Sequence, residues 1–490
     1  MATITSTAAV SWQTVRAAFQ QIWGYEDFRP PQGEVIQALL AQRDALIVMP
    51  TGGGKSICFQ LPALLQAGLT LVISPLVALM ENQVEELRQR RLPAALLHSE
   101  LAPYQRTQIL RTLEAQRLRL LYLSPETLLS ASVWERLSQP HLKINGLILD
   151  EAHCLVQWGE TFRPAYRRLG AVRPALLKTK PAGAKIAIAA FTATADSIAQ
   201  RTLREVLQLR QPKMVRLNPY RSNLHLAVQQ VWTPRGRRQA MKRFIQARTQ
   251  QAGLVYVRTR RDSEELAAWF RSQGRRTAAY HAGLGPEERR QIEADWINDK
   301  LLFVVCTSAF GMGINRQNGV RWIFHYHAPT LISEYVQEIG RAGRDGQRAD
   351  ALTLVSEPTG WLDPDDRGRR QYFRDQDRKQ RQVAQRLIKQ IPIQGDVRTV
   401  ARHFKQGAIA LSLLHSTGQL EWQDPFNYVI DRSAAPKALS QDDATRQMTQ
   451  FLRTRGCRWQ YILEAFGFGR EAQSQLKMGC GHCDRCLALS

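Results

Sequence analysis

Residues 44–56, DALIVMPTGGGKS, carry the strongest indication of fold in this chain. The apolar run at residues 45–49 predicts a buried strand, and a predicted helix follows the loop. A strand that leads through a glycine-rich loop into a helix is typical of a phosphate-binding loop, because the glycines let successive backbone N–H groups face phosphate oxygens. The residues expected to hold a nucleotide here are Thr51, Gly52, Gly53, Gly54, Lys55 and Ser56.

Two acidic residues complete this predicted site. Asp150 and Glu151 follow the apolar run at residues 146–149, so a parallel sheet would deliver both carboxylates to the edge that carries the loop. We expect Lys55 to reach the β- and γ-phosphates, and Ser56 and Asp150 to bind Mg²⁺ through oxygen ligands and water. Glu151 is the candidate base that orients and deprotonates the attacking water.

Short apolar runs alternate with amphipathic stretches along most of the chain. One series lies between residues 24 and 216, and a second begins near Leu226. Buried strands separated by helices predict parallel sheets covered on both faces. The expected fold class is therefore α/β with two sheet domains, joined by the turn-forming segment LNPYRSNL at residues 217–224.

The composition changes after Asp363, where charged residues replace the apolar periodicity. The basic run from Arg367 to Lys389 is either a contact for DNA phosphates or a solvated linker. Three helical and two strand-like segments lie between Arg381 and Ile430, an order typical of a winged helix. Short core-forming helices would give a similar pattern, so both interpretations stay open.

Basic residues dominate the charge of the chain. Lys and Arg together exceed Asp and Glu by 24. A polyanion is the expected partner, nucleic acid first, although a basic but otherwise ordinary enzyme has the same charge balance. The sequence has no apolar run long enough to cross a bilayer and no secretory or transit signal, so we expect no membrane partner. The expected location is the cytoplasm, in association with the nucleoid if the protein is bacterial.

Four of the seven cysteines lie near the C-terminus, a lone cysteine followed by the compact segment CGHCDRC. Gaps of two residues let neighbouring sulfurs face one ion, and four thiolates fill the shell of a structural zinc. An iron–sulfur cluster and the replacement of one ligand by His482 are the alternatives. The predicted zinc ligands are Cys457, Cys480, Cys483 and Cys486, and the predicted core cysteines are Cys58, Cys154 and Cys306.

A second cationic element, QEIGRAGRDG, occupies residues 337–346. Arg341 and Arg344 are three residues apart, so we expect them to share one face of a helix. An arginine that reaches a transferring phosphate stabilises the charge that builds there, and such a residue is worth roughly 10³ to 10⁵ in rate. Both arginines are predicted to be catalytic, and a surface helix with ion pairs is the alternative.

These motifs resemble those of the RecQ family of superfamily 2 helicases, from about Trp12 to Gly346 and again from Cys457. The segments that carry the resemblance are WGYEDFRPPQ (23–32), MPTGGGKS (49–56), LVISPLVALMENQ (71–83), YLSPE (122–126), LDEAHC (149–154), QWGETFRPAY (157–166), FTATA (191–195), YHAGL (280–284), FGMGIN (310–315) and QEIGRAGRDG (337–346). The resemblance implies movement 3′ to 5′ along single-stranded DNA. It also implies that Tyr25, Arg29 and Gln32 contact the adenine end of ATP.

A DNA-coupling loop is a further implication of the resemblance. Trp158, Phe162, Arg163 and Tyr166 match the aromatic-rich loop that in this family couples DNA contact to hydrolysis. Aromatic rings and an arginine suit stacked, unpaired bases, although core packing is the alternative for Trp158 or Phe162. The chain departs from the family pattern here, because Glu160 stands where a His is usual and Thr161 where an acid is usual. We therefore expect weaker or differently regulated stimulation by DNA.

The expected architecture is two tandem RecA-like domains, a small winged-helix-like module and a zinc-binding module. The expected boundaries are 1–24 for a helical lead-in, 25–216 for the ATP-binding domain, 217–363 for the second RecA-like domain, 364–435 for the basic linker and winged helix, and 436–490 for the zinc module. This order is permuted relative to the family, in which the winged helix follows the zinc module.

The expected function is ATP-dependent 3′–5′ unwinding of duplex DNA in repair or recombination, with ATP, Mg²⁺ and Zn²⁺ as cofactors. Single-stranded and forked DNA are the expected partners of a monomeric enzyme. The alternatives are a DEAH-type RNA helicase, a DNA translocase that does not unwind, and a DNA-binding protein with an inactive ATPase. Intact Lys55, Asp150, Glu151 and Arg344 argue against the last of these.

Overall fold

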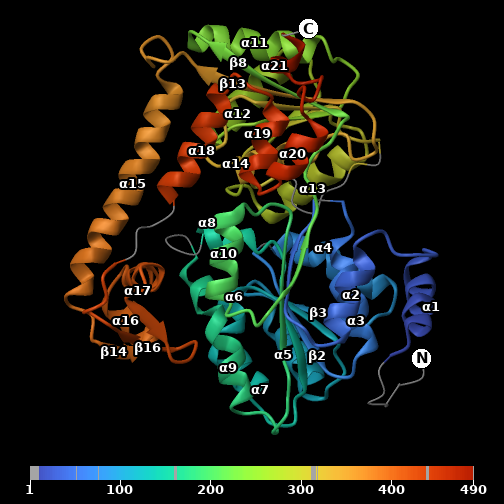
Figure 1. Cartoon of the computed structure of the whole chain (residues 1–490), viewed down its shortest axis with the longest axis vertical. Helices are drawn as coiled ribbons and strands as arrows, with labels where there is room; N and C mark the ends of the chain where they lie inside the picture. The colour runs from blue at the N-terminus through green and yellow to red at the C-terminus, as the bar shows by residue number, and fades with distance from the viewer. Residues whose placement is uncertain are drawn as a thin grey trace. The chain divides into compact units, whose positions relative to one another are not determined.

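The chain folds into two compact units, shown in a computed structural model (Figure 1). Unit 1 comprises residues 1–217 and 377–439, and unit 2 comprises residues 218–376 and 440–490. The structure describes residues 10–488 except 51, 76, 159–162, 311–315, 317 and 437–440. Within helices it leaves the side chains of residues 78, 157, 158, 370, 373, 374, 377 and 441–444 undescribed.

Unit 1 contains a seven-stranded parallel sheet, which confirms the predicted α/β class. Its strand order is β3-β4-β2-β5-β6-β1-β7. The strands are β1 (Ala45–Val48), β2 (Leu69–Ile73), β3 (Ala94–Leu97), β4 (Leu120–Leu123), β5 (Ile144–Leu149), β6 (Ala187–Thr192) and β7 (Lys213–Arg216). Only β6 separates β5 from β1, so the segments that follow β1 and β5 leave the same edge of the sheet close together.

Both faces of this sheet are buried because its strands are apolar at successive positions. Leu46 and Leu71 pack into the hydrophobic cluster on one face, whereas Ile47 and Val72 pack into the cluster on the other. Helices cover both faces in Figure 1. They are α1 (Trp12–Trp23), α2 (Gln32–Leu40), α3 (Lys55–Leu65), α4 (Val77–Gln89), α5 (Pro103–Glu114), α6 (Pro125–Leu128), α7 (Ala131–Leu137), α8 (His153–Trp158), the 3₁₀ helix η1 (Pro164–Ala171), α9 (Val172–Leu177) and α10 (Ser197–Val206).

Unit 2 repeats this design with six parallel strands in the order β10-β11-β9-β12-β13-β8. The strands are β8 (Leu224–Val231), β9 (Gly253–Tyr256), β10 (Thr277–Tyr280), β11 (Phe303–Cys306), β12 (Trp322–His325) and β13 (Ala349–Ser356). The helices are α11 (Pro234–Gln246), α12 (Arg260–Arg271), α13 (Pro286–Ile297) and α14 (Ile332–Ile339). The predicted core residues Cys58, Cys154 and Cys306 are fully buried in the two units.

The charged segment after Asp363 is a helix, α15 (Asp365–Ile388), rather than an irregular linker. It leads into the winged-helix-like module, which we define as residues 384–430. The elements after α15 are β14 (Gln394–Asp396), α16 (Val397–His403), α17 (Gly407–Ser416), β15 (Leu420–Trp422) and β16 (Asn427–Ile430). The three strands form an antiparallel sheet in the order β14-β16-β15. This succession of helices and strands is that of a winged helix.

The last part of the chain belongs to the core of unit 2. Its helices are α18 (Gln441–Arg453), α19 (Arg458–Ala465), α20 (Gly469–Gln475) and α21 (Asp484–Leu487). Phe451 and Trp459 share a hydrophobic cluster with Leu226 and Ile323 of the sheet. Residues 384–430 belong to unit 1, and residues 441–488 belong to unit 2. Among the described residues, no helix has the length and apolar character needed to cross a membrane.

Candidate nucleotide-binding and metal sites

The phosphate loop joins β1 to α3, as predicted. Gly52 and Gly54 have φ values of 86° and 72°, which glycine adopts far more readily than other residues. Lys55 is buried and donates from Nζ to the carbonyl oxygen of Met49 at 3.2 Å, so its charge is held inside the loop. Ser56 is half-buried at the second position of α3. Thr51 lies outside the described residues.

Gln32 contacts the phosphate loop directly. Its Nε2 donates to the carbonyl oxygens of Gly53 and Gly54 at 3.2 and 3.4 Å, and its Oε1 accepts from the N–H of Arg29 at 3.0 Å. The side chains of Tyr25 and Arg29 are exposed on the segment before α2. The three residues assigned to the adenine by resemblance therefore have different surroundings. Gln32 braces the phosphate loop, whereas Tyr25 and Arg29 face solvent.

Asp150 lies immediately after β5, and its side chain is buried. Its Oδ2 accepts from Nε2 of Gln83 at 3.1 Å, and its Oδ1 accepts from the N–H of Glu151 at 3.0 Å. Burial and, to a lesser extent, the charge of Glu151 raise the pKa of Asp150 to about 6, and Lys55 opposes the shift. Because the charge of Lys55 acts on Asp150, this carboxylate lies near the phosphate loop. An oxygen ligand for Mg²⁺ is needed at that position.

Glu151 occupies an unusual backbone conformation, with φ at 49°. Non-glycine residues in this region cost about 1–3 kcal/mol and cluster at functional sites. Nδ1 of His153 lies 3.3 Å from Oε2 of Glu151 and 3.3 Å from Oγ1 of Thr192, at the end of β6. The DEAH segment is thereby linked to the FTATA segment, a contact that the spacing of the motifs did not predict.

The structure describes the side chains of only two of the four predicted DNA-coupling residues, Arg163 and Tyr166. Arg163 donates from Nη1 to the carbonyl oxygen of Pro75 at 2.6 Å, and its Nε lies 3.5 Å from Oε1 of Glu126. Tyr166 is fully buried in the core of unit 1, so its ring has no face open to a base. Phe162 lies outside the described residues, as do Glu160 and Thr161, and the side chain of Trp158 is not described.

Arg341 and Arg344 do not share a helical face. Helix α14 ends at Ile339, and both arginines lie in the turns that follow, because the backbone leaves the helix at Gly340 and reaches a φ of 60° at Gly343. Arg341 is buried, and its charge acts on the buried phenol of Tyr256. Arg344 is half-buried and donates from Nε to the carbonyl oxygen of Gly340 at 3.3 Å.

Two side chains missed from the sequence hold these turns. Arg221 donates from Nη1 to the carbonyl oxygen of Gly340 at 3.4 Å and also contacts the carbonyl of Gly343. Asn223 donates to the carbonyl oxygens of Gly343 and Gln347 at 2.8 and 2.7 Å. Both belong to the segment LNPYRSNL, whose turn formers indicated only a connection between domains.

A buried ion pair anchors α14 itself. Arg258, two residues after β9, donates through two nitrogens to the two carboxylate oxygens of Glu338 at 3.3 and 3.2 Å. Nε2 of His325 lies 2.9 Å from the same carboxylate. Burial opposes ionisation, but Arg258 and His325 outweigh it and lower the pKa of Glu338. The pair fixes the helix that leads into the arginine turns.

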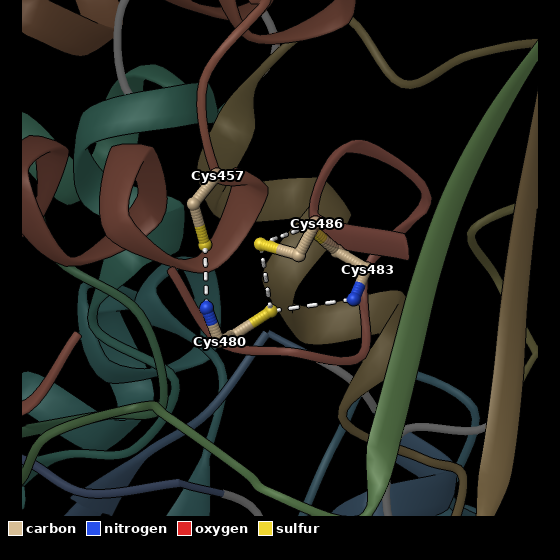
Figure 2. Close-up of side chains that lie close together, drawn as sticks. All are labelled: Cys457, Cys480, Cys483 and Cys486. Carbon is tan, nitrogen blue, oxygen red and sulfur yellow. Dashed lines mark hydrogen bonds between the residues drawn. The ribbon is translucent and has the colours of Figure 1, made fainter. Parts of the chain in front are cut away.

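The four C-terminal cysteines form one cluster, as Figure 2 shows. Their sulfurs all lie within 4.8 Å of one another, with 3.9 Å between Cys480 and Cys486 and 3.5 Å between Cys483 and Cys486. A tetrahedral zinc with Zn–S bonds of about 2.3 Å requires sulfur separations of about 3.8 Å, so the donor set fits zinc. The N–H groups of Cys480 and Cys483 point at the sulfurs of Cys457 and Cys480, both at 3.3 Å, which suits thiolate acceptors.

His482 is turned away from this cluster. Its Nδ1 lies 2.6 Å from the carbonyl oxygen of Cys480, so the ring nitrogen donates to that carbonyl. The groups of metal-binding side chains found among the described residues include the four cysteines and not this histidine. The geometry thus favours a four-cysteine site over one in which His482 replaces a thiolate.

The cysteine cluster fixes contacts to the outer strand of the unit 2 sheet. Trp459, two residues after Cys457, donates from Nε1 to the carbonyl oxygen of Leu224 at 3.0 Å. Asp484, directly after Cys483, accepts from the N–H of Val228 at 3.1 Å. Side chains next to the ligands therefore satisfy backbone groups along the edge of β8, which has no neighbouring strand on that side among the described residues.

Three family models match successive parts of the chain. Residues 29–202 match the DEAD/DEAH box helicase model, residues 236–346 the helicase conserved C-terminal domain, and residues 423–487 the RecQ zinc-binding model. The ATP-dependent DNA helicase RecQ of Synechocystis is 53% identical over 477 residues, which cover 97% of this chain and 98% of that protein. The chain belongs to the RecQ family of ATP-dependent DNA helicases.

Other RecQ relatives match the motor portion. The RecQ helicase of Haemophilus influenzae is 39% identical over 356 residues, which cover 71% of this chain and 54% of that protein. Among solved structures, Mss116 bound to single-stranded RNA has a TM-score of 0.59 at 16% identity, covering 71% of this chain and 74% of that one. MrfA bound to DNA has a TM-score of 0.59 at 18% identity, covering 72% and 52%. Likenesses at such low identity support the helicase fold alone.

Family membership agrees with the chemistry of the two sites. The helicase models cover the phosphate loop, the DEAH carboxylates and the arginine turns, which confirms the prediction of a helicase and ATPase. The RecQ zinc-binding model covers all four clustered cysteines, which supports zinc rather than an iron–sulfur cluster. It begins at residue 423, inside the winged-helix-like module and ahead of the first cysteine.

Proposed function

We propose that this chain is an ATP-driven helicase that moves 3′ to 5′ along single-stranded DNA and separates the duplex ahead of it. The observation that carries the proposal is the buried group formed by Lys55, Asp150 and Glu151 at one edge of the unit 1 sheet. This group occurs in a chain that matches a Synechocystis DNA helicase over nearly its whole length. A phosphate loop without buried carboxylates beside it would bind a nucleotide but would not hydrolyse it.

Each residue of the group has a proposed role in hydrolysis. The backbone N–H groups of residues 52–54 and the ammonium of Lys55 bind the phosphates of ATP. Ser56 and Asp150 would hold Mg²⁺, which supplies charge that neutralises the phosphate oxygens as the bond breaks. Glu151 accepts a proton from the attacking water, and protonated His153 holds the Glu151 carboxylate in place for that step.

Arginines of unit 2 are proposed to stabilise the charge that builds on the transferring phosphate. Arg344 is the stronger candidate because its side chain is half-buried and lies outside the core of unit 2. Arg341 is directed into that core beside Tyr256, where it supports the turn. Tyr25 and Arg29 are exposed, so their side chains are available to the adenine ring.

Two observations support the proposal that the partner is DNA: the basic charge of the chain and the position of Arg163. An excess of 24 basic residues favours binding to a polyanion. Arg163 contacts Pro75 and lies one residue before η1. A DNA strand bound at this arginine would therefore act on elements that lead back to the nucleotide site. We propose a monomer that acts on single-stranded and forked DNA during repair or recombination.

Forked substrates of identical sequence test the proposal. Four forks are compared, of DNA or RNA, each with a single 3′ or 5′ tail. The DNA fork with a 3′ tail should be separated in the presence of ATP and Mg²⁺, and Lys55→Ala should abolish the reaction. Separation of RNA forks alone would indicate an RNA helicase, and ATP hydrolysis without strand separation would indicate a translocase; either result would overturn the proposal.

A further inference from the structure

The winged-helix-like module of unit 1 has a topology that is often used to read DNA. In helix-turn-helix modules, the second helix of the pair enters the major groove and presents polar side chains to the bases. The helix in that position here is α17, which follows α16 after a short turn. What α17 exposes therefore decides whether this module reads duplex DNA.

Helix α17 exposes no charged side chain and has no fully exposed residue. All ten of its residues are described, and each is buried or half-buried; Leu411, Leu413 and Leu414 belong to the module's core. Its sequence, GAIALSLLHS, contains no Lys, Arg, Asp or Glu. Burial lowers the pKa of His415 to about 4, so this residue is neutral at pH 7. A helix without charged side chains makes no ionic contact with phosphates and lacks the arginine or lysine that reads guanine.

Unit 1 itself covers the module. Helix α17 packs against η1, and Ala171 of η1 lies within the hydrophobic core of the module. The ring of Phe426, in the loop between β15 and β16, lies 5.2 Å from that of Trp134 at an interplanar angle of 76°. Beside this ring pair, Arg168 of η1 donates from Nη1 to the carbonyl oxygen of Pro425 at 3.1 Å.

A second contact joins the module to the end of α6. The guanidinium of Arg398 lies 4.8 Å from the centre of the Phe426 ring and donates from Nη2 to the carbonyl oxygen of Leu129 at 3.5 Å. Leu129 directly follows α6, and Glu126 within α6 pairs with Arg163. The module therefore touches both elements, η1 and α6, that hold Arg163 in its position.

We propose that the winged-helix-like module is an internal brace that positions Arg163 for contact with single-stranded DNA, and that Arg168 is a positioning residue in this role. The inference rests on the proposed function. Arg168 ties η1 to the loop of the module, whereas Arg398 and Phe426 tie α6 to the same loop. Loosening either tie lets Arg163 shift relative to Pro75, so the nucleotide site responds less readily to DNA. The module reads no duplex sequence through α17.

Four variants of the full-length protein test this inference. Arg168→Gln removes the tie, Arg168→Lys keeps its charge, and Phe426→Leu loosens the same contact independently. Arg402→Gln is the matched control, because Arg402 is an exposed basic residue of α16 on the same module. For each, ATP hydrolysis is measured without DNA and against single-stranded DNA concentration, together with Tm and the affinity for blunt duplex DNA.

Arg168→Gln and Phe426→Leu should raise the DNA concentration for half-maximal stimulation roughly fivefold, the equivalent of about one lost hydrogen bond. Hydrolysis without DNA should be unchanged, and Arg168→Lys should restore most of the response. Arg402→Gln should match the wild type in every measurement. An unchanged stimulation curve for Arg168→Gln, or a loss of duplex affinity in Arg402→Gln alone, would overturn the inference while the proposed function stands. A wild-type enzyme that neither responds to DNA nor separates a fork with a 3′ tail would overturn both.

Discussion

The imidazole of His153 lies 3.3 Å from the carboxylate of Glu151, and both side chains are buried. Burial by itself would lower the pKa of His153, but Cys154 and Glu151 raise it to about 10. Both neighbours favour the protonated ring, and Glu151 lies close enough to pair with it. Stability from this pair is fully present below the unfolded pKa of about 6.5 and is lost as the pH rises through 10.

His153→Ala should lower kcat for DNA-stimulated ATP hydrolysis by roughly tenfold, because the carboxylate of the proposed base loses the partner that orients it. The affinity for ATP should change little, since the phosphate loop is untouched. Steady-state kinetics with saturating DNA would measure both. His141→Ala, at an exposed position of the same unit, is the control. Equal kcat values for the two variants would contradict the assigned role.

The raised pKa of Asp150 predicts that activation by Mg²⁺ depends on pH. With a pKa of about 6, most Asp150 carboxylates are ionised at pH 7, but only about one in ten at pH 5. The Mg²⁺ concentration for half-maximal hydrolysis should therefore rise roughly tenfold between pH 7 and pH 5. The stability of the fold should change with pH in the opposite direction. A raised carboxyl pKa stabilises the folded state most below pH 4, and this stabilisation is lost as the pH rises through 6. A Mg²⁺ requirement that is constant across this range would refute the assignment.

Gly54→Ala should abolish tight binding of ATP. The φ of 72° is unfavourable for alanine, and its Cβ would lie 2.2 Å from Nε2 of Gln32. Gly24→Ala is a matched control, because its φ is 78° but a Cβ there meets nothing within 4 Å. Both substitutions should lower the free energy of unfolding by about 1 kcal/mol. Only the first should weaken nucleotide binding in a titration with a fluorescent ATP analogue, and equal affinities would show that Gln32 does not brace the loop.

Zinc removal should destabilise unit 2 and expose the edge of β8. Without the metal, Trp459 and Asp484 lose the neighbouring anchors that hold them against Leu224 and Val228. Chelation or Cys483→Ser should lower Tm by roughly 10 °C and promote aggregation through the unpaired edge. Met478→Ser, in the same segment with a side chain 99% exposed, should have no effect. Thermal scans with light scattering measure both effects. Equal Tm and equal aggregation of the two variants would show that zinc does not protect the edge of β8.

Much of the motor fold could be predicted because buried parallel strands are continuous apolar runs bounded by turn formers. β3, β7 and β8 were not anticipated. β7 contains two basic residues, half-buried Lys213 and exposed Arg216, and β8 mixes polar with apolar residues because it is an outer strand of its sheet. Local spacing also misled the prediction for Arg341 and Arg344, since three-residue spacing fits a helix only while the helix continues, and Gly340 ends it.

The nucleotide residues could be assigned from short motifs because the loop and the carboxylates each follow a strand. Contacts between motifs could not be predicted, because short motifs describe only local structure. Gln32 lies 21 residues from Gly53, and His153 lies 39 residues from Thr192. The position of the winged-helix-like module on η1 depends on Arg168 reaching Pro425, 257 residues away. Nothing in the local pattern of either segment indicates such a pairing.

Hydrolysis at Glu151 is proposed to drive strand separation. Glu151→Gln keeps the shape of the side chain but removes its basicity. We expect this variant to bind ATP with near wild-type affinity while both ATP hydrolysis and separation of a DNA fork with a 3′ tail fall at least about 100-fold. Parallel measurement of the three quantities is the most direct test. Fork separation that persists while hydrolysis is lost would contradict the account.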